Sequence, residues 1–173
     1  EIGSMGNTGA QSRFFEDTLA ELCQLTLGQY SDIMLRRALS NSKSLSADVS
    51  AAVDPNYEGV QDKRNAPYVN KGIAITKYTG SRGKSGASDA HAEFVGQIRM
   101  LFNSNDVVWQ SGELGKVDQG GGGTIAQFVA NLGMDVLDCG VPLLSMHAPL
   151  EISAKLDVYM AYKAYRVFYE KMK

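Results

Sequence analysis

The sequence has little cysteine and no long hydrophobic run, and each shortage excludes a class of protein. Its two cysteines, Cys23 and Cys139, show no Cys-x-x-Cys spacing, and Cys23 lies in a helical pattern that buries a thiol as a small hydrophobic group. No apolar run approaches the roughly 18 residues of a membrane helix, and the first residues lack the basic-then-apolar order of a secretory signal. We therefore expect a reduced, cytoplasmic chain with no membrane partner.

The sequence also lacks an excess of basic charge. Its 17 lysines and arginines stand against 19 aspartates and glutamates, so neither nucleic acid nor an anionic membrane is an expected partner. What remains is an ordinary globular composition, with 44% hydrophobic and 21% charged residues in a chain of 173. A chain of that length buries roughly 70% of the surface that its unfolded form exposes, which is enough for one core. We find no internal repeat, low-complexity linker or second domain.

Histidine is scarce as well, with two in the chain, and this draws attention to His147. It ends a short apolar segment that Pro149 then breaks, and a histidine presented there can be a metal ligand. Its expected partners are Asp48, at the end of a strand-like segment, and Glu1. Two carboxylates and an imidazole suit zinc or a similar divalent ion. Taken singly, a strand-end histidine is ordinarily a satisfied polar residue, and a lone aspartate a turn or cap residue.

The spacing of apolar residues predicts helices that alternate with strands. The expected helices run from a cap at Asn7 or Thr8 to Gly28, from Ser31 or Asp32 through Ala38, from Ser88 or Asp89 through Leu101, from Thr124 through Leu132, and from Ala154 through Met172. The expected strands are 44–48, 72–78, 107–109, 135–139 and the segment before His147. This alternation favours an α/β layer with a largely parallel sheet, in which ligands lie beyond the C-terminal ends of strands.

Three other segments carry expectations. Residues 54–70 are polar and irregular, and a loop of that length could border a pocket. Residues 80–86 form a turn-rich tract. In the last helix one stripe, containing Met160 and Ala164, is expected to be core. A second stripe of tyrosines (Tyr162, Tyr165 and Tyr169) fits a buried flank better than a partner surface.

The glycine run at 120–123 suggests phosphate binding, because backbone amides before a helix N-terminus attract anions. The run lacks the Gly-Lys-Ser/Thr ending of a phosphate loop, since no lysine precedes Thr124. Phosphate binding is therefore not expected. The same amides could approach a substrate backbone or a developing oxyanion, with a plain tight turn as the alternative.

Four motifs together resemble those of a known family. They are Glu-Ile-Gly-Ser at 1–4 with Gly-Ala-Gln-Ser at 9–12, Ser-Ala-Asp at 46–48 leading to Asp-Pro-Asn-Tyr at 54–57, Gly-Gly-Thr-Ile at 122–125, and Ser-Met-His at 145–147. In order and spacing they are similar to the metal-dependent aminopeptidases that include aspartyl aminopeptidase and vacuolar aminopeptidase I. The resemblance implies a three-layer helix-sheet-helix, zinc-exopeptidase-like fold. It covers residues 1–173, as the C-terminal part of one catalytic domain, with the upstream portion and the inserted dimerisation domain absent.

The resemblance also implies metal ligands. In that family a pair of glutamates precedes Ile/Val-Gly-Ser, the first acting as general base and the second binding metal. Glu1 matches the second, so the general base is expected just upstream of it. Asp48 resembles the terminal ligand of one metal ion, and His147 the ligand that, with Glu1, holds the other. His91 falls in the wrong order along the chain and receives no role.

Residues that contact substrate follow from the same match. Met146 would line the substrate's entry, and the amides of Gly122 and Gly123 would approach the substrate backbone. Lys77 lies near the position of a specificity lysine in relatives that prefer acidic residues. Alignment through Gly72 places Thr76 at that position instead, and a solvated lysine is the alternative.

The activity that the resemblance implies is hydrolysis of the first peptide bond of a peptide by water activated between two zinc ions, with cobalt or manganese possible. The partners implied are the peptide, the remainder of the catalytic domain and further copies of the chain, in a homo-oligomer that is a dodecamer in the family. Two alternatives remain: a non-catalytic α/β assembly or ligand-binding module, and a nucleotide-binding domain that uses the glycine run.

Overall fold

The computed structural model describes residues 4–82, 85–116 and 118–172. Its main sheet has four strands in the order β1 (Lys43–Ser46), β8 (Asp135–Gly140), β3 (Ile73–Thr76) and β6 (Trp109–Ser111). β1 pairs in parallel with β8, and β3 in parallel with β6, while β8 and β3 are antiparallel. The sheet is therefore mixed but mostly parallel, which agrees with the α/β prediction.

Two small sheets extend the main one. In the first, β9 (Pro142–Leu144) lies between β2 (Ser50–Ala51) and β10 (Ile152–Ser153). In the second, β4 (Tyr78–Ser81) lies between β5 (Ser85–Asp89) and β7 (Gly121–Gly122). Of the tract that we predicted as turns, Gly80 and Ser81 belong to β4, and Ser85 and Gly86 belong to β5. Its alternation of small polar residues and glycine gives no hydrophobic period from which a strand could be predicted.

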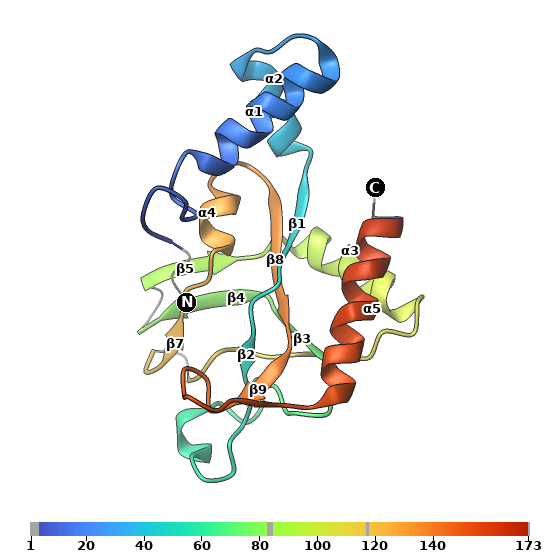
Figure 1. Ribbon diagram of the computed structural model, residues 1–173. Coiled ribbons are helices and arrows are strands. Elements are labelled where there is room, and N and C mark those ends of the chain that lie inside the picture. Colours follow the sequence, from blue (N-terminus) through green and yellow to red (C-terminus); the bar gives the residue numbers. More distant parts are fainter. Residues whose placement is uncertain (1–3, 83–84, 117, 173) are drawn as a thin grey trace.

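Helices cover both faces of the main sheet. Leu137 and Cys139 of β8 point into the core, where they pack with α3 (Ala92–Asn103) and α5 (Lys155–Lys171). The alternate residues of β8 face α4 (Ala126–Ala130), which lies on the other side of the strand (Figure 1). The result is three layers of helix, sheet and helix, as the resemblance implied.

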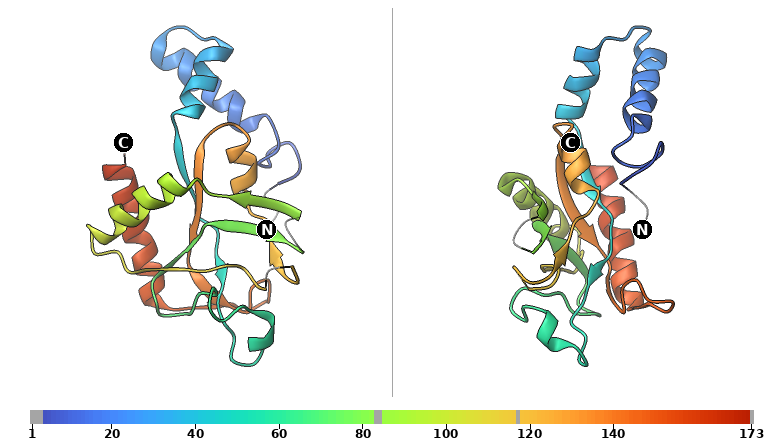
Figure 2. Two further views of the ribbon diagram at one scale, coloured as in Figure 1. Left: turned by 180° about the vertical axis from the view of Figure 1, so that it is seen from behind. Right: turned by 90° about the vertical axis from the view of Figure 1, so that its left-hand side faces the viewer.

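The first two helices stand apart from this body. α1 (Phe14–Leu27) and α2 (Asp32–Ser40) form a hairpin that projects beyond the sheet in every view (Figures 1 and 2). α1 ends at Gly28 as predicted, with a left-handed C-cap, but begins at Phe14 rather than beside Asn7 or Thr8. None of the side chains of α1 is buried, although the helix is rich in leucine and phenylalanine.

Other boundaries differ from the predictions by a few residues. α3 starts at Ala92, because Ser88 and Asp89 are used in β5, and α4 starts at Ala126 rather than Thr124. In α5 the stripe through Met160 and Ala164 is buried as expected. The tyrosine stripe is not a buried flank throughout: Tyr165 is half-buried, whereas Tyr162 and Tyr169 are exposed. Within the described ranges every helix is too short or too polar to cross a membrane.

Candidate metal centre

Asp48 lies in the bend where the chain leaves the main sheet at β1 and enters the small sheet at β2. The paired strands of the same chain, β8 and β9, make the same passage between the two sheets. They are joined through Gly140, so this bend lies against the bend at Asp48. A Cβ atom at Gly140 would stand 1.4 Å from the backbone oxygen of Asp48, and only glycine permits this approach. The side chain of Asp48 is exposed, and its Oδ1 accepts a hydrogen bond of 2.8 Å from the N–H of Val49.

His147 lies in a turn three residues beyond the end of β9, not at the end of the strand itself. The turn is closed by a hydrogen bond from the N–H of Ala148 to the carbonyl oxygen of Ser145, and the N–H of His147 donates to Oε1 of Glu151 at 2.6 Å. Ser145 and His147 both have positive φ angles, 61° and 67°. Non-glycine residues held in this region are strained, and they cluster at functional sites.

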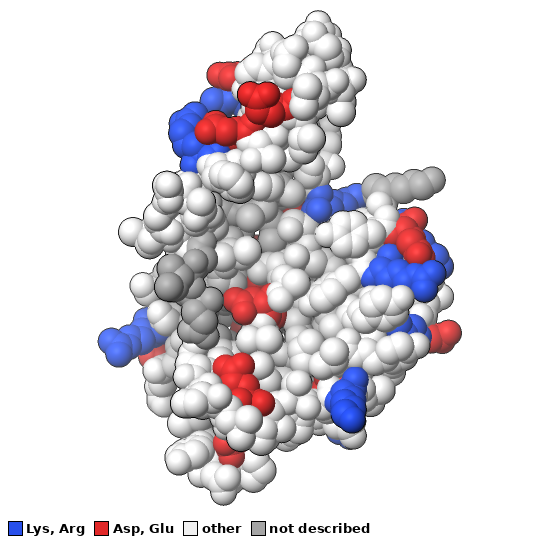
Figure 3. All heavy atoms as spheres, in the orientation of Figure 1, with Lys and Arg blue, Asp and Glu red and all other residues white. Residues whose placement is uncertain are grey.

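The two residues belong to the same strand pair. Asp48 precedes β2 and His147 follows β9, and these strands pair in parallel with Ser50 opposite Pro142. On the face drawn in Figure 3, acidic side chains gather where the chain passes from β1 to β2 and again near the loop that follows β9. Negative charge of this kind favours a cation over an anion.

The third predicted ligand, Glu1, lies outside the described residues. Among the residues that are described, no group of three His, Cys, Asp or Glu side chains is placed to hold a metal ion. The structure therefore positions Asp48 and His147 individually, and the joint site with Glu1 stays a prediction.

A buried aspartate near this bend was missed from the sequence. Asp138 lies on β8 opposite Ser46, and its Oδ2 accepts a hydrogen bond of 3.0 Å from the Thr124 hydroxyl. Burial raises the pKa of Asp138, and the charge of Asp48 raises it further; Ser46 and Thr124 act in the opposite direction. The signal for it was a carboxylate in the middle of the apolar run 135–140, which is unusual for a strand buried on both faces.

The predicted substrate residues lie in three different environments. Gly122 is part of β7, where it pairs with Gly80 of β4, and Gly123 follows on an exposed stretch before α4. Met146 is half-buried in the turn that holds His147. Lys77 is exposed and forms an ion pair with Asp89 at 2.5 Å. Its charge is thus partly neutralised within the chain.

The glycine run does not form a phosphate loop. Gly121 and Gly122 are used in the antiparallel ladder with β4, and the helix that follows has only five residues. A Cβ atom at Gly121 would lie 2.0 Å from the backbone oxygen of Gly80, so close strand pairing accounts for a glycine there.

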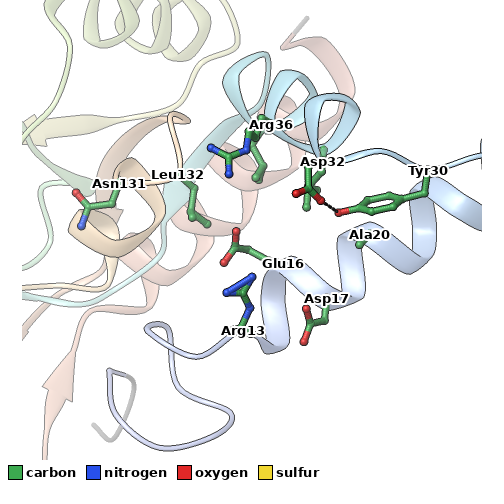
Figure 4. A pocket seen from close by; sticks show the side chains of 11 residues that line it. Arg13, Glu16, Asp17, Ala20, Tyr30, Asp32, Arg36, Asn131 and Leu132 are labelled. Carbon is green, nitrogen blue, oxygen red and sulfur yellow. Dashed lines mark hydrogen bonds between the residues drawn. The ribbon is translucent and has the colours of Figure 1, made fainter.

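A pocket of about 210 Å³ lies between the α1–α2 hairpin and α4 (Figure 4). Acidic and basic side chains both line it, among them Glu16 and Arg36. Tyr30 donates a hydrogen bond of 2.9 Å to Asp32 at its edge. None of the predicted site residues is among those that line it, and its mixed charge favours no one class of ligand.

The fold and these positions define a class: an α/β domain whose carboxylate and imidazole side chains lie in the connections between paired strands. A model of the aminopeptidase I zinc metalloprotease family (M18) matches residues 1–169. The chain belongs to this family.

Relatives and solved structures agree with that assignment. The probable M18 family aminopeptidase 1 of Clostridium acetobutylicum is 56% identical over 168 residues, which are 97% of this chain and 36% of that protein. The probable M18 family aminopeptidase 1 of Thermotoga maritima is 50% identical over 99% of this chain and 38% of its own length. The crystal structure of an M18 family aminopeptidase from Thermotoga maritima has a TM-score of 0.94, at 50% identity, over 99% of this chain and 38% of that chain. The chain thus spans less than two-fifths of the length of these relatives.

Proposed function

We propose that this chain is part of a di-zinc aminopeptidase that hydrolyses the N-terminal residue from peptides. The observation that carries the proposal is the identity of 56% to a relative named as an M18 aminopeptidase, over nearly the whole chain. The positive φ of His147, 67°, is compatible with this proposal, because residues held in this region are found at functional sites.

In this proposal Glu1, Asp48 and His147 are metal ligands. The donor chemistry fits zinc, since neutral imidazole and carboxylate oxygen are among its usual ligands. Asp48 is exposed, and its Oδ1 accepts the hydrogen bond from the N–H of Val49. The Glu151 contact fixes the backbone of His147. The bound metal supplies a water of lowered pKa, and the general base is a glutamate expected just before Glu1.

The substrate residues follow from their positions. Met146 is one residue from His147, so its half-buried thioether would border the substrate beside that ligand. Gly122 and Gly123 would offer backbone amides where the ladder with β4 ends. Lys77 would favour acidic residues only if a substrate carboxylate displaced Asp89, which weakens the case for acidic preference.

We further propose that the complete protein is a cytoplasmic homo-oligomer. One of the solved structures that resembles this fold is the mApe1 dodecamer of S. cerevisiae, with a TM-score of 0.79 and 23% identity. The apolar residues that α1 exposes supply a surface for the remainder of the catalytic domain or for another copy.

The test uses the chain joined to its upstream sequence. The joined protein should release N-terminal residues from peptides, and a chelator should abolish the activity. His147→Ala should lower kcat/KM by at least about 100-fold, because a metal ligand is lost. His91→Ala is the matched control, since His91 is exposed and pairs with Glu93 at 3.2 Å, and this variant should retain activity. Equal activity of the two variants would contradict the assignment.

The alternative is a non-catalytic α/β assembly or binding module, and the exposed tyrosines of α5 favour it. Tyr159 and Tyr162 stack with ring centroids 6.3 Å apart on the surface, as aromatic residues do at many interfaces. This alternative predicts that Asp48→Ala and His147→Ala leave every measurable property intact. It is excluded if either variant loses zinc-dependent peptide hydrolysis in the joined protein.

A further inference from the structure

A small cavity lies behind the bend that carries Asp48. Its volume is about 20 Å³, which is the space of roughly one water-sized sphere. Asp48, Ser50, Thr79, Thr124 and Asp138 are among the residues that line it. Its lining combines apolar side chains with the hydroxyl and carboxylate groups of Ser50, Thr79 and Asp138.

Three of these oxygens are buried without a hydrogen bond. They are Oδ1 of Asp138, Oγ of Ser50 and Oγ1 of Thr79, and no partner for them exists within residues 4–82, 85–116 and 118–172. The three residues are 8%, 6% and 4% exposed. Buried polar atoms in native proteins are almost always paired, so three such atoms around one cavity indicate a bound species between them.

The charge around the cavity is negative. No lysine or arginine in the described part of the chain forms an ion pair with Asp138, and the groups that stabilise its charge are the neutral hydroxyls of Thr124 and Ser46. Asp48, at the same cavity, adds a second carboxylate. A buried carboxylate requires a counter-charge or a proton, and the surroundings provide several oxygen ligands for a cation.

We infer that this cavity binds a monovalent alkali cation, sodium by size. Oxygen ligands select hard cations, and the buried carboxylate of Asp138, the one carboxylate among the proposed ligands, balances a single positive charge. Calcium uses six to eight oxygens, usually with several carboxylates, whereas Asp138 is the one carboxylate among these ligands, and magnesium retains several waters for which the cavity has no room. The proposed ligands are Asp138, Ser50 and Thr79. None of them is one of the zinc ligands proposed above.

The three proposed ligands come from three different sheets. Asp138 belongs to the main sheet, Ser50 to the β2–β9–β10 sheet and Thr79 to the β4–β5–β7 sheet. An ion bound to all three ties the three sheets together directly behind Asp48. Binding should therefore stabilise the fold and fix the bend, whether or not zinc is present.

The experiment measures the thermal unfolding of the 173-residue chain in 0.2 M sodium, potassium or choline chloride, with EDTA added as its Tris salt to remove zinc. For a dissociation constant of roughly 20 mM, sodium should raise Tm by about 4 °C relative to choline. Asp138→Asn keeps the shape of the side chain and should abolish the difference, as should Thr79→Val. Asp135→Asn, on the same strand but outside the cavity, is the matched control and should keep it.

Line broadening of the sodium-23 resonance by the unmodified chain, reversed by potassium only at higher concentration, gives a second readout that needs no variant. Equal Tm in all three salts, with no sodium-23 broadening, would overturn the proposal and leave an ordered water or a protonated Asp138 in the cavity. A response to calcium at micromolar concentration without one to sodium would overturn it as well. Because zinc is removed throughout, these outcomes are independent of the proposed peptidase activity.

Discussion

Asp157 is a fully buried carboxylate near the start of α5, and it anchors the end of the long loop 54–70. Its two oxygens accept hydrogen bonds from the N–H groups of Asn70 and Gly72, at 2.6 and 2.7 Å. Asp157→Ala leaves both amides without this partner, and we expect a loss of about 3 kcal/mol in the free energy of unfolding. Urea denaturation measures the loss. Glu21→Ala, an exposed acid on α1, should change stability by less than about 0.5 kcal/mol, and an equal effect of the two would contradict this role.

Glu113 should make the free energy of unfolding depend on pH, and the sign of that dependence can be measured. Burial, with a smaller contribution from the charge of Asp89, raises the pKa of Glu113 to about 7, while Lys77 lowers it. Because the folded pKa lies above the unfolded value, the folded state favours the protonated form. Protonated Glu113 therefore stabilises the folded state. This contribution to the free energy of unfolding is complete below the unfolded pKa of about 4.5 and is lost as the pH rises through the folded pKa of about 7.

The expected loss between pH 4.5 and 8 is roughly 1 to 2 kcal/mol, after allowance for the partial exposure of the side chain. Urea denaturation of the unmodified chain and of Glu113→Gln across this range measures it. The free energy of unfolding of the variant should fall less steeply with pH. A steeper fall would show that the sign is wrong.

At the scale of single residues, sequence patterns located exposed functional candidates better than buried polar ones. Asp48 and His147 stand out because each follows a predicted strand and because their motifs resemble a family. Asp138 and Asp157 do not stand out, because their role depends on which distant amides and hydroxyls the fold brings to them. Thr124 and Asp138, for example, are joined only when α4 packs on β8. Lys77 is similar: its ion pair with Asp89 exists only because β4 and β5 pair.

At the scale of elements, the bend between β1 and β2 depends on the absence of a side chain at Gly140. A methyl group there would overlap the backbone of Asp48, so Gly140→Ala must push the bend away from β8. We expect a loss of at least about 2 kcal/mol in the free energy of unfolding and, in the joined enzyme, a weaker affinity for zinc. Gly96→Ala is the control: no atom lies near its Cβ position in α3, and alanine there should stabilise by roughly 0.5 to 1 kcal/mol. Denaturant titration of both variants distinguishes these opposite signs.

Periodicity predicted which elements exist better than where they begin. The five α-helices of the described residues were all expected, because each carries apolar residues at helical spacing, whereas the 3-10 helix Glu58–Val60 was not. Some helices begin later than predicted because the residues before them belong to another element. For example, Ser88 and Asp89, the predicted caps of α3, pair as the end of β5. β4, β5 and β7 were not expected, because glycine and serine carry no hydrophobic period and pair here through backbone contacts alone.

At the scale of the whole molecule, the distribution of buried surface is uneven. The core joins α3, α5 and the main sheet. None of the residues of α1 is buried, and its apolar side chains Phe14, Leu25 and Leu27 are more than half exposed. Single exposed apolar residues are ordinary, but a whole helix of this composition presents an apolar surface of the kind that other protein segments cover. This agrees with a chain that spans 36 to 38% of the length of the relatives that match it.

The uncovered helix predicts how the 173-residue chain behaves in solution. Its exposed leucines should drive concentration-dependent association, since burial of each stabilises by about 1.5 to 3 kcal/mol. Leu25→Lys combined with Leu27→Lys should shift the chain to a monomer in sedimentation velocity while leaving its unfolding midpoint nearly unchanged. Leu150→Lys places the same charge at a leucine that is 75% exposed but lies in the loop after β9, away from α1. If Leu150→Lys dissociated the chain as well as the α1 variant does, the association would not depend on α1; if neither did, α1 would not be the covered surface.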